Sequence, residues 1–412
     1  MTLCDLTQSY AATGGGIRTY LHAKRAWLDA HTSVRHVLIV PGPEDRVVRE
    51  GRHVTHFVRS PPVPGSSVYR LLLRNGRVRE ILAAERPDAV ECLCGYNLPW
   101  AALRHQRDVD PRCAVVAGYR TDFPTAYTEP LVAGVLGGRA GRASKELAYR
   151  YVQRLYRRFD AVYALSPSSA ALLAERGIDV RLLPLGVDLD RFDPSRRDPA
   201  LRAALGVAPG EPLLAYAGRL DAEKRPADVV EAFRQLPPAL GAHLLLMGDG
   251  PQRATLEAGA PDRVHVLGFV DDRDRYARLL ASADVYVSAM PHETFGISIV
   301  EAQASGLPVV GVRSGAMPDR VPDGTGLLGP VGDVGAMAAN VAAVLAGPAE
   351  EMGRRARAHV AAHFAWATTF RRLMDLYEET LSARRGERVV VPLRAGPAAE
   401  RSGHAAPPLP AA

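Results

Sequence analysis

Residues 292–310 read HETFGISIVEAQASGLPVV, and this stretch decides how the rest of the chain is interpreted. An apolar run at 284–288 precedes it and helical periodicity follows Gly296, which predicts a strand, a tight loop and the start of a helix. Gly296 has no side chain to keep a ligand away, and the backbone N–H groups that follow it lack partners at a helix N-terminus. The turn can therefore hold a phosphate group.

Two carboxylates, Glu293 and Glu301, stand on either side of this turn. Because carboxylates repel phosphate, they make sense here as acceptors of hydrogen bonds from neutral hydroxyls next to it. A phosphate flanked by hydroxyls describes a nucleotide-sugar. Two glutamates at this spacing are also common on capped amphipathic helices, where they are solvated or favour the N-terminal dipole.

The full stretch closely resembles the E-x7-E signature of retaining glycosyltransferases of family 4, which have the GT-B fold. The resemblance implies two doubly wound, Rossmann-like α/β domains facing a cleft. It also implies that Glu293 orients sugar hydroxyls, that Glu301 binds the ribose, and that a backbone segment holds sugar and phosphate through Phe295, Gly296 and Ile297.

Length and composition agree with a two-domain globular protein. The chain has 412 residues, 47% hydrophobic and 23% charged, and exceeds what a single core accommodates. It starts without the charged and apolar regions of a signal peptide, and no apolar run reaches about 18 residues. We expect a cytoplasmic protein, with peripheral attachment to the inner face of the cell membrane. The four cysteines lack metal-ligand spacing and are expected to be core thiols.

Apolar runs separated by helical segments predict parallel sheets with crossover helices. In an N-terminal, acceptor-binding domain 1–190 they lie at 2–6, 36–40, 89–93, 114–118, 161–165 and 180–185. In a nucleotide-sugar-binding domain 191–365 they lie at 213–219, 243–248, 264–268, 284–288 and 308–312. A helix at 366–385 is expected to cross back to the first domain, as in relatives of this fold. Residues 386–412 are rich in Pro, Ala and Gly and predict a disordered tail.

Two cations follow the strand that opens the second domain. Arg219 and Lys224 lie in the loop at its carboxyl end, where a departing diphosphate would be stabilised by fixed positive charge. Only three of the chain's 51 cations are lysines, so a lysine here is unusual. The pair resembles the family's diphosphate-binding Arg and Lys, although an exposed loop with scattered charges is the alternative. Val270, after the strand at 264–268, is expected to help bind the base.

The first domain offers two further segments. Gly15 and Gly16 follow the first strand and look like the glycine loop that this family aims at the donor phosphate and the acceptor, although a simple turn is the alternative. Residues 118–127 look like the H-T-D-F-P segment of lipid-directed members, except that Arg120 replaces the histidine. We include Arg120 and Asp122 in the catalytic set, although the histidine's role does not transfer to arginine and Asp122 can instead shape a turn.

The resemblance implies retaining transfer, in which the acceptor hydroxyl attacks on the face that the diphosphate leaves and no protein nucleophile is needed. The catalytic set is therefore expected to comprise Arg120, Asp122, Arg219, Lys224 and Glu293. The D-x-D pairs Asp108/Asp110, Asp188/Asp190 and Asp272/Asp274 match a pattern that arises readily by chance. We expect no metal, and no cofactor besides the nucleotide-sugar co-substrate.

Positive charge is concentrated between Arg139 and Arg158, where seven cations face one acid. Four of these arginines, at 150, 154, 157 and 158, fall at helical spacing with Leu147, Tyr151 and Leu155 on another face. This pattern suits a helix on an anionic membrane surface, and it suits a solvated helix face equally well. We expect no nucleic-acid partner, because no recognisable binding motif is present.

The resemblance of the segment at 119–127 favours GDP-mannose as donor. The positive charge at 139–158, just after that segment, favours a lipid or glycolipid acceptor at a membrane surface. Three alternatives stay open at this point. The chain could use a UDP-sugar and a soluble small-molecule acceptor, it could be a sugar-nucleotide epimerase of GT-B fold, or it could be a nonenzymatic binding protein with a degenerate site. Turnover of labelled donor with and without lipid extract would separate them.

Overall fold

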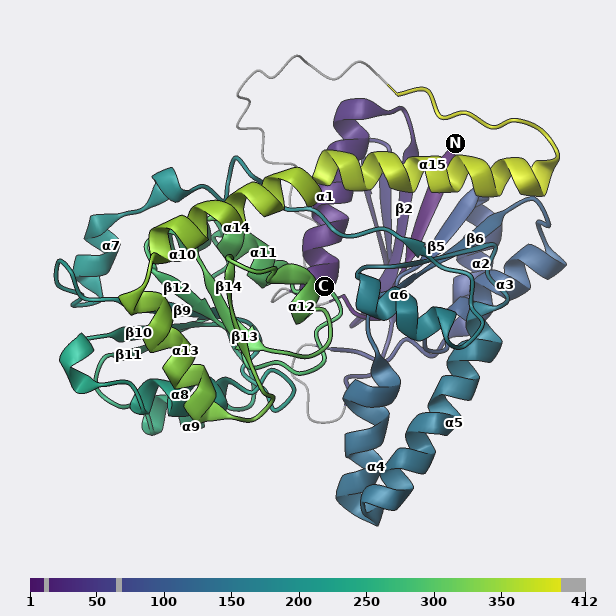
Figure 1. Ribbon diagram of the computed structural model, residues 1–412. Coiled ribbons are helices and arrows are strands. Elements are labelled where there is room, and N and C mark those ends of the chain that lie inside the picture. Colours follow the sequence, from purple (N-terminus) through teal and green to yellow (C-terminus); the bar gives the residue numbers. More distant parts are fainter. Residues whose placement is uncertain (11–14, 64–68, 394–412) are drawn as a thin grey trace. The chain divides into compact units, whose positions relative to one another are not determined.

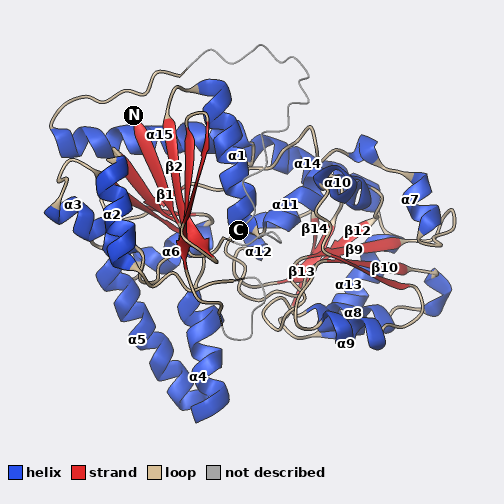
Figure 2. Ribbon diagram, turned by 180° about the vertical axis from the view of Figure 1, so that it is seen from behind, coloured by secondary structure: helices blue, strands red, loops and turns tan. Residues whose placement is uncertain are grey.

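A computed structural model of the chain describes residues 1–10, 15–63 and 69–393. The chain divides into two compact units. The first comprises Met1–Leu183 together with Ala367–Ala412, and the second comprises Pro184–Trp366. Each unit is built on one mainly parallel sheet with helices packed against it (Figures 1 and 2). The boundary at 183 lies a few residues before the Pro-terminated segment where the sequence places it.

The first unit has an eight-stranded sheet in the order β3-β4-β2-β1-β5-β6-β7-β8, in which only β3 is antiparallel to its neighbour. The strands are β1 (Thr2–Leu6), β2 (Arg35–Gly42), β3 (Arg46–Glu50), β4 (His53–Arg59), β5 (Ala89–Cys92), β6 (Ala114–Tyr119), β7 (Ala161–Ala164) and β8 (Arg181–Leu182). The helices are α1 (Gly16–His31), α2 (Asn75–Glu85), α3 (Pro99–Asp108), the π-helical η1 (Pro124–Thr128), α4 (Glu129–Leu136), α5 (Gly138–Tyr156), α6 (Pro167–Ala174) and α15 (Trp366–Arg385).

Local chemistry accounts for these elements. β5 and β6 are buried along their whole length and, apart from Glu91 in β5, carry no charged residue, as expected of strands covered on both faces. Ser166 caps α6 by accepting a hydrogen bond from the Ser169 backbone N–H, as the sequence Ser166-Pro-Ser-Ser predicts. All four cysteines are buried and unpaired, which confirms that they are core thiols.

The second unit has a six-stranded, fully parallel sheet in the order β11-β10-β9-β12-β13-β14. The strands are β9 (Leu213–Ala217), β10 (His243–Met247), β11 (Val264–Gly268), β12 (Val285–Val287), β13 (Val309–Val312) and β14 (Gly326–Gly329). The helices are η2 (Pro194–Arg196), α7 (Pro199–Ala204), α8 (Pro226–Arg234), η3 (Pro238–Leu240), α9 (Arg253–Ala258), α10 (Arg273–Ala281), α11 (Ile297–Ala304), α12 (Met317–Arg320), α13 (Val334–Ala346) and α14 (Ala349–His363).

The strand order of the second unit reverses between β9 and β12. The chain runs outward from β9 to β11, and then returns to place β12 on the other side of β9. In open α/β sheets the helices that follow the two strands at such a point lie on opposite faces, and ligands bind in the crevice at the carboxyl ends of those strands. The loops after β9 and β12 carry Lys224 and Glu293 to this place.

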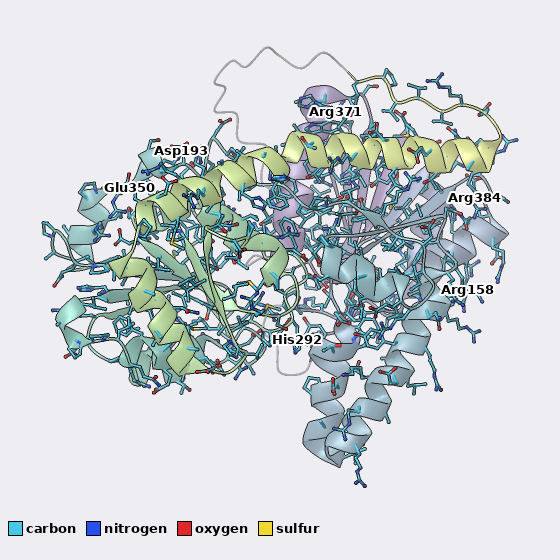
Figure 3. The ribbon with its side chains drawn as sticks, in the orientation of Figure 1. Arg158, Asp193, His292, Glu350, Arg371 and Arg384 are labelled. Carbon is cyan, nitrogen blue, oxygen red and sulfur yellow. The ribbon has the colours of Figure 1, made fainter. Side chains whose placement is uncertain are left out.

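Helix α15 belongs to the first unit, although the second unit lies between α15 and the rest of the first unit in the sequence. The Phe370 ring packs against the rings of Tyr20 and Trp27, with centroids 5.7 and 5.9 Å apart. Near the other end of α15, Arg384 (Figure 3) donates a hydrogen bond of 2.7 Å to Asp160. These contacts attach both ends of the helix to the first unit.

Residues 386–393, at the start of the segment predicted to be a disordered tail, are ordered against α15. Val391 is buried, and its backbone N–H donates to Glu378 Oε1 at 2.6 Å, so residues 386–393 fold back along α15. The composition of this segment gave no sign of that packing, because the contacts come from a helix rather than from its own periodicity. The remainder of the expected tail, 394–412, lies outside the described residues.

Helices α4 and α5 form a hairpin that projects from the sheet of the first unit (Figures 1 and 2). The two helices cross closely at Gly141, where a Cβ atom would come within 2.7 Å of the Ala133 Cβ. Only the sheet-proximal part of α5 is buried well, through Tyr149, Val152, Leu155 and Tyr156. Within the described ranges, no helix is both long and apolar enough to cross a membrane.

Candidate functional site

An ion pair joins the two loops at the reversal point of the second unit. The Lys224 Nζ, after β9, lies 2.9 Å from Glu293 Oε2, after β12. Both side chains keep some contact with solvent, 24% for Lys224 and 13% for Glu293. Two residues that the sequence predicts for donor binding are thus brought into direct contact.

Glu293 is held as an anion. Burial alone would raise the pKa of its carboxyl, but the charge and hydrogen bond of Lys224 lower it below its ordinary value, and the Phe295 and Gly296 backbone N–H groups add to that effect. The same turn N–H groups were predicted to hold phosphate. Because two of these N–H groups help to keep the pKa of the Glu293 carboxyl low, the turn favours negative charge beside it.

Gly296 is required by the shape of the turn. Its φ is +82°, and a Cβ atom there would come within 2.5 Å of the Ile299 side chain and 3.2 Å of the Glu293 Cγ. An L-side chain would be strained at this φ and would also clash. Ile297 then begins α11 directly, so the first N–H groups of that helix follow the anion-binding turn.

A buried arginine supports the turn from behind. Arg320 in α12 is 2% exposed, donates from Nε to the Phe295 carbonyl at 2.8 Å, and lies between the rings of Phe295 and Phe364, 4.4 and 4.6 Å from their centroids. Burial lowers the pKa of Arg320 to about 10, so it remains charged at neutral pH. The sequence analysis missed this residue, because nothing nearby distinguishes it among many arginines.

Arg219 lies in the same loop as Lys224. Its guanidinium pairs with Asp221 at 2.6 Å and with Glu223, and its own carbonyl accepts a hydrogen bond from the Tyr216 hydroxyl at 2.9 Å. The Asp221 carboxylate in turn accepts from the Lys224 backbone N–H at 3.0 Å. Acidic neighbours and a buried tyrosine therefore fix the loop that presents both cations.

Glu301 is buried in α11 and already has two partners. Its Oε1 accepts from Arg273 at 2.5 Å, and its Oε2 accepts from the Tyr276 hydroxyl at 3.1 Å; both donors lie in α10. Each carboxylate oxygen can accept a further hydrogen bond. Contact with a ribose therefore stays a prediction, and Arg273 joins the candidates as a residue that sequence reasoning missed.

Val270 lies apart from this centre. It follows β11, the edge strand, which is two strands away from β9 in the sheet. Neighbouring strands are about 4.8 Å apart, so Val270 is on the order of 10 Å to the side of the β9 loop. That separation suits the base end of a nucleotide, and its role stays a prediction.

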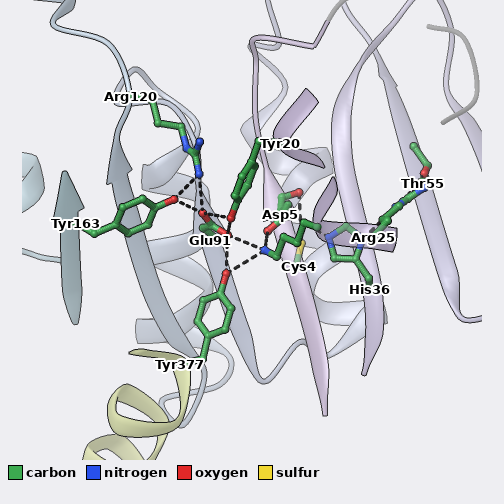
Figure 4. A network of polar contacts seen from close by, with 11 residues as sticks. Cys4, Asp5, Tyr20, Arg25, His36, Thr55, Glu91, Arg120, Tyr163 and Tyr377 are labelled. Atoms are coloured by element: carbon green, nitrogen blue, oxygen red, sulfur yellow. Dashed lines mark hydrogen bonds and ion pairs between the residues drawn. The ribbon is translucent and has the colours of Figure 1, made fainter. Parts of the chain in front are cut away.

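In the first unit, Arg120 follows β6 and points into a buried polar network (Figure 4). Its side chain is 3% exposed. One guanidinium nitrogen donates to Glu91 Oε1 at 3.3 Å and to the Tyr163 hydroxyl at 2.5 Å, and the guanidinium lies over the Tyr20 ring at 3.9 Å. These contacts give Arg120 a clear part in the fold, while its catalytic role stays a prediction.

Glu91 is the centre of that network. Besides Arg120, it accepts hydrogen bonds from Lys24 at 2.6 Å and from the hydroxyls of Tyr20, Tyr163 and Tyr377. Lys24 also donates to Asp5 at 2.6 Å and to Tyr377 at 2.9 Å, so all three of its protons have acceptors. The network ties β1, α1, β5, β6, β7 and α15 together.

Asp122 fixes the turn after β6 to the projecting hairpin. Its carboxylate accepts hydrogen bonds from the Tyr119 hydroxyl at 2.7 Å and from the Tyr149 hydroxyl, in α5, at 2.8 Å. This geometry supports the turn-shaping alternative, while leaving a catalytic role as a prediction.

Gly15 and Gly16 lie where β1 leads into α1. Gly15 is the N-cap with φ +106° and supplies no side-chain cap, so the first N–H groups of α1 have no acceptor from that residue. A helix N-terminus of this kind attracts anions. The two glycines keep their predicted role toward phosphate.

The D-x-D pairs have local structural roles. Asp272 accepts from the backbone N–H groups of Asp274 and Arg275 at the start of α10, and Asp108 pairs with Arg107 at 2.6 Å. In the part of the chain that the structure describes, no three His, Cys, Asp or Glu side chains are grouped as metal ligands.

Family models match both units of the chain. Residues 14–191 match "Glycosyltransferase Family 4", and residues 211–347 match "Glycosyl transferases group 1". A GDP-mannose-dependent alpha-(1-6)-phosphatidylinositol dimannoside mannosyltransferase of Mycobacterium tuberculosis is 32% identical over 329 residues, 77% of this chain and 81% of the relative. A D-inositol 3-phosphate glycosyltransferase of Saccharomonospora viridis is 37% identical over 225 residues, 50% of this chain and 52% of the relative.

Solved structures share the fold at low sequence identity. Sucrose-phosphate synthase of Thermosynechococcus elongatus matches with a TM-score of 0.76 and 21% identity over 93% of this chain and 99% of the other. HepE of Anabaena in complex with UDP matches with a TM-score of 0.70 and 18% identity over 92% of this chain and 100% of the other. Together with the two parallel sheets, these likenesses confirm the predicted GT-B fold.

Proposed function

Because the chain belongs to the glycosyltransferases of family 4, we propose that it transfers mannose from GDP-mannose, with retention of configuration, to a lipid or glycolipid acceptor. Glycosyl transfer itself follows from the family. The single observation that carries the site assignment is the Lys224–Glu293 contact at the reversal point of the second sheet, with an anion-accepting turn beside it. The donor, the acceptor and retention are the proposed details.

In the proposed donor complex, the diphosphate takes the place that the Glu293 carboxylate occupies beside Lys224 and the turn N–H groups. Lys224 and Arg219 then stabilise the negative charge that develops as the sugar–phosphate bond breaks. Glu293, freed from part of this pairing, accepts hydrogen bonds from the sugar hydroxyls. Phe295, Gly296 and Ile297 supply backbone groups, and Arg320 keeps them in place.

Retention is proposed to occur without a protein nucleophile. The acceptor oxygen forms its bond to the anomeric carbon on the face from which the diphosphate leaves, and a diphosphate oxygen receives the acceptor proton. The bond between the anomeric carbon and the diphosphate breaks in the same process. Fixed cations at the leaving group supply the stabilisation that this route needs.

The donor base and the acceptor are proposed from the relatives. The mannosyltransferase of M. tuberculosis, which covers more of this chain than the inositol phosphate enzyme does, is named for GDP-mannose and a phosphatidylinositol mannoside. This supports a lipid-linked acceptor, reached by a peripheral protein at the cytosolic face of the membrane. The second candidate is a soluble acceptor, which the likeness to a D-inositol 3-phosphate glycosyltransferase supports over half of the chain.

A thermal-shift panel of GDP-mannose, GDP-glucose, UDP-glucose, UDP-N-acetylglucosamine and ADP-glucose tests the donor. Ligand that binds only the folded state raises its stability by RT ln(1 + [L]/Kd). We expect stabilisation by both GDP-sugars and turnover only with GDP-mannose, assayed by transfer of labelled mannose to a phosphatidylinositol mannoside in detergent. Stabilisation by UDP-sugars alone, with transfer to inositol phosphate, would establish the second candidate instead.

We also propose that no metal ion takes part, because Lys224 and Arg219 can serve the diphosphate. Activity should persist in excess EDTA and should not rise when Mg²⁺ or Mn²⁺ is added. Loss of transfer in EDTA that Mn²⁺ restores would overturn this part of the proposal and leave the family assignment untouched.

A further inference from the structure

The outer part of the α4–α5 hairpin carries apolar side chains with no partner. Leu131, Val135 and Leu136 in α4 and Leu147 in α5 are 66–78% exposed, and α4 contains no buried residue at all. Leu131 and Val135 are four residues apart, so they lie on one face of the helix. Large apolar groups gathered on a projecting element mark an interaction surface rather than scattered surface residues.

The same part of the hairpin carries unneutralised positive charge. In the described part of the chain, Arg139 and Arg142 at the tip have no ion-pair partner, and neither do Arg150 and Arg154 nearer the sheet. The one acid of α5, the exposed Glu146, offsets only one of these charges. Some arginines elsewhere on the first unit do pair, as Arg74 does with Asp45 at 2.8 Å. Glu129, the acid of α4, is already paired with Lys145 at 2.6 Å and therefore does not neutralise these arginines. The charge is therefore available to an outside anion.

We infer that the outer part of this hairpin, residues 131–147, is a membrane anchor that inserts its apolar side chains at the headgroup boundary of an anionic bilayer. A bilayer surface supplies both kinds of partner at once. Leucine and valine side chains enter the acyl boundary, while arginine stems extend beside them and place their guanidinium groups among the phosphates. The structural argument for the anchor stands on the hairpin alone, but the use of the anchor in catalysis rests on the proposed lipid acceptor.

Two other occupants fit less well. In a symmetric dimer the same patch faces itself, which would bring Arg139 and Arg142 of one copy against those of the other. Nucleic acid would neutralise the arginines but would leave the four apolar side chains in water. Only an anionic surface with an apolar interior satisfies both sets of side chains.

The structure changes how the basic segment acts. The sequence suited a helix lying along a membrane surface through Arg150, Arg154, Arg157 and Arg158 as well as it suited a solvated face, but the inner half of α5 is packed onto the unit. Arg158 lies at the sheet-proximal end of α5 (Figure 3), over the Trp100 ring at 5.6 Å, and Arg157 donates to the Gly177 carbonyl at 3.2 Å. The tip of the hairpin therefore meets the membrane, and not the length of α5.

The base of the hairpin gives this anchor a use. Tyr149 of α5 donates to Asp122, so the hairpin is fixed to the turn that follows β6 and Arg120. From Pro124 to Leu136 the chain is continuously helical and spans about 20 Å at roughly 1.5 Å per residue. Docking through the tip would hold the β6 end of the first unit at that distance from the headgroups.

The experiment is co-sedimentation of the full chain with vesicles of phosphatidylcholine alone or with one part phosphatidylglycerol to two parts phosphatidylcholine. The apolar variant is Leu131→Gln/Val135→Gln/Leu136→Gln, and the charge variant is Arg139→Gln/Arg142→Gln. Glutamine is a good helix former, so the hairpin should persist, which circular dichroism checks. The matched control is Leu73→Gln/Val109→Gln, two exposed apolar residues of the same unit outside the hairpin.

We expect wild type and control to bind the anionic vesicles alike. The apolar variant should bind at least about tenfold more weakly, because the transfer of three side chains is lost. The charge variant should lose about thirtyfold at low salt and show a smaller salt dependence. Equal binding by wild type and the apolar variant, or concentration-dependent dimerisation of wild type that the apolar variant abolishes, overturns the inference.

Transfer assays separate this inference from the proposed function. If wild type binds anionic vesicles but glycosylates only soluble acceptors, the anchor stands and the lipid acceptor is wrong. If wild type glycosylates lipid in vesicles and the apolar variant does so equally well while binding equally well, the anchor is wrong and the lipid acceptor stands. In detergent solution, the apolar variant should retain wild-type transfer.

Discussion

Glu91 and Glu293 are two carboxylates, one buried and one partly exposed, that lie near corresponding points of two similar sheets. Glu91 lies in β5, which joins β1 where the first sheet reverses, and Glu293 follows β12, which joins β9 where the second sheet reverses. Each is paired with one of the chain's three lysines, Lys24 and Lys224. The shared arrangement makes their difference informative.

The difference is in how completely each carboxylate is enclosed. Glu91 is 1% exposed and has five side-chain donors, including Tyr377 of the distant helix α15. Glu293 keeps 13% of its side chain exposed, pairs with a single lysine, and lies beside a turn that can bind other anions. A saturated buried carboxylate fixes a fold, whereas one with remaining exposure and exchangeable partners can serve a ligand.

The largest effect should come from removing the charge of Glu91. Glu91→Gln leaves Lys24 with Asp5 and removes the carboxylate that pairs with Arg120, and an uncompensated buried charge costs about 3–5 kcal/mol. Urea unfolding should show this loss, whereas Glu146→Gln, on the exposed face of α5, should change stability by less than about 0.5 kcal/mol. In a Lys24→Met background the cost of Glu91→Gln should shrink, and no such shrinkage would contradict the pairing. Donor affinity of the folded protein should be unaltered.

Lys224→Met should lower activity much more than stability, which is the opposite of the effect expected for Glu91→Gln. Because Lys224 is a quarter exposed, its loss should lower stability only slightly, but kcat should fall by about 10²–10³ when its charge is missing from the leaving diphosphate. Rates with saturating donor measure this. Arg225→Met, the adjacent cation paired with Asp228 at 2.8 Å, is the matched control and should keep kcat within a few-fold. If both variants lose activity equally, the proposed role of Lys224 at the leaving diphosphate is contradicted.

The third prediction concerns how the free energy of unfolding depends on pH, and it involves His36, whose partner Asp5 lies beside Glu91 in the sheet. Arg25 Nε–H donates to His36 Nδ1 at 3.1 Å, so His36 is neutral with its proton on Nε2, which donates to Asp5 at 2.8 Å. Burial lowers the pKa of His36 to about 4 from an ordinary value of 6.5. Between these values the unfolded chain binds more protons, so the free energy of unfolding should fall as pH drops from 6.5 to 4, by about 3 kcal/mol.

Unfolding curves at several pH values measure that slope, and His36→Asn should reduce it, since an amide does not titrate in this range. A variant with the wild-type slope would show that another group is responsible.

The smallest effect should distinguish the two ends of the donor. Glu301→Ala should weaken nucleotide binding by about tenfold and leave kcat nearly unchanged, because a ribose contact is made equally in ground and transition states. Glu293→Ala should instead lower kcat mainly. Calorimetry with the free nucleotide diphosphate and rates at saturating donor give the two numbers. Unchanged nucleotide affinity in Glu301→Ala would remove the ribose assignment.

Much of the fold could be predicted because the strands of a covered parallel sheet are short apolar runs. β1, at Thr2–Leu6, and β11, at Val264–Gly268, have the predicted limits. β3 and β4 were missed, since residues 46–59 mix Arg, His and Glu with valines, and those polar groups find partners only in the folded sheet. β14 was missed because four residues, Gly326–Gly329, are too short to show a period.

For the site, the sequence could identify groups that share a loop but not groups that meet from afar. Glu293, Gly296 and Lys224 carry local signals, namely a motif, a turn residue and a rare lysine. Arg320 supports Phe295 from 25 residues away, and no spacing rule predicts that contact. The scarcity of lysine that identified Lys224 also applied to Lys24 and Lys145, and each of the three makes an ion pair in the structure.

The position of Tyr377 in the Glu91 network has a consequence for biosynthesis. The strands around Glu91 are complete once Leu183 has been made, but the ribosome must add roughly 190 more residues before Tyr377 exists. At ordinary elongation rates that takes about 10–40 s. During this interval the nascent first unit holds a buried ion pair without one of its donors, while the second unit, contiguous in sequence, can already fold. Helix α15, translated after the whole second unit, thus completes the domain whose synthesis began first.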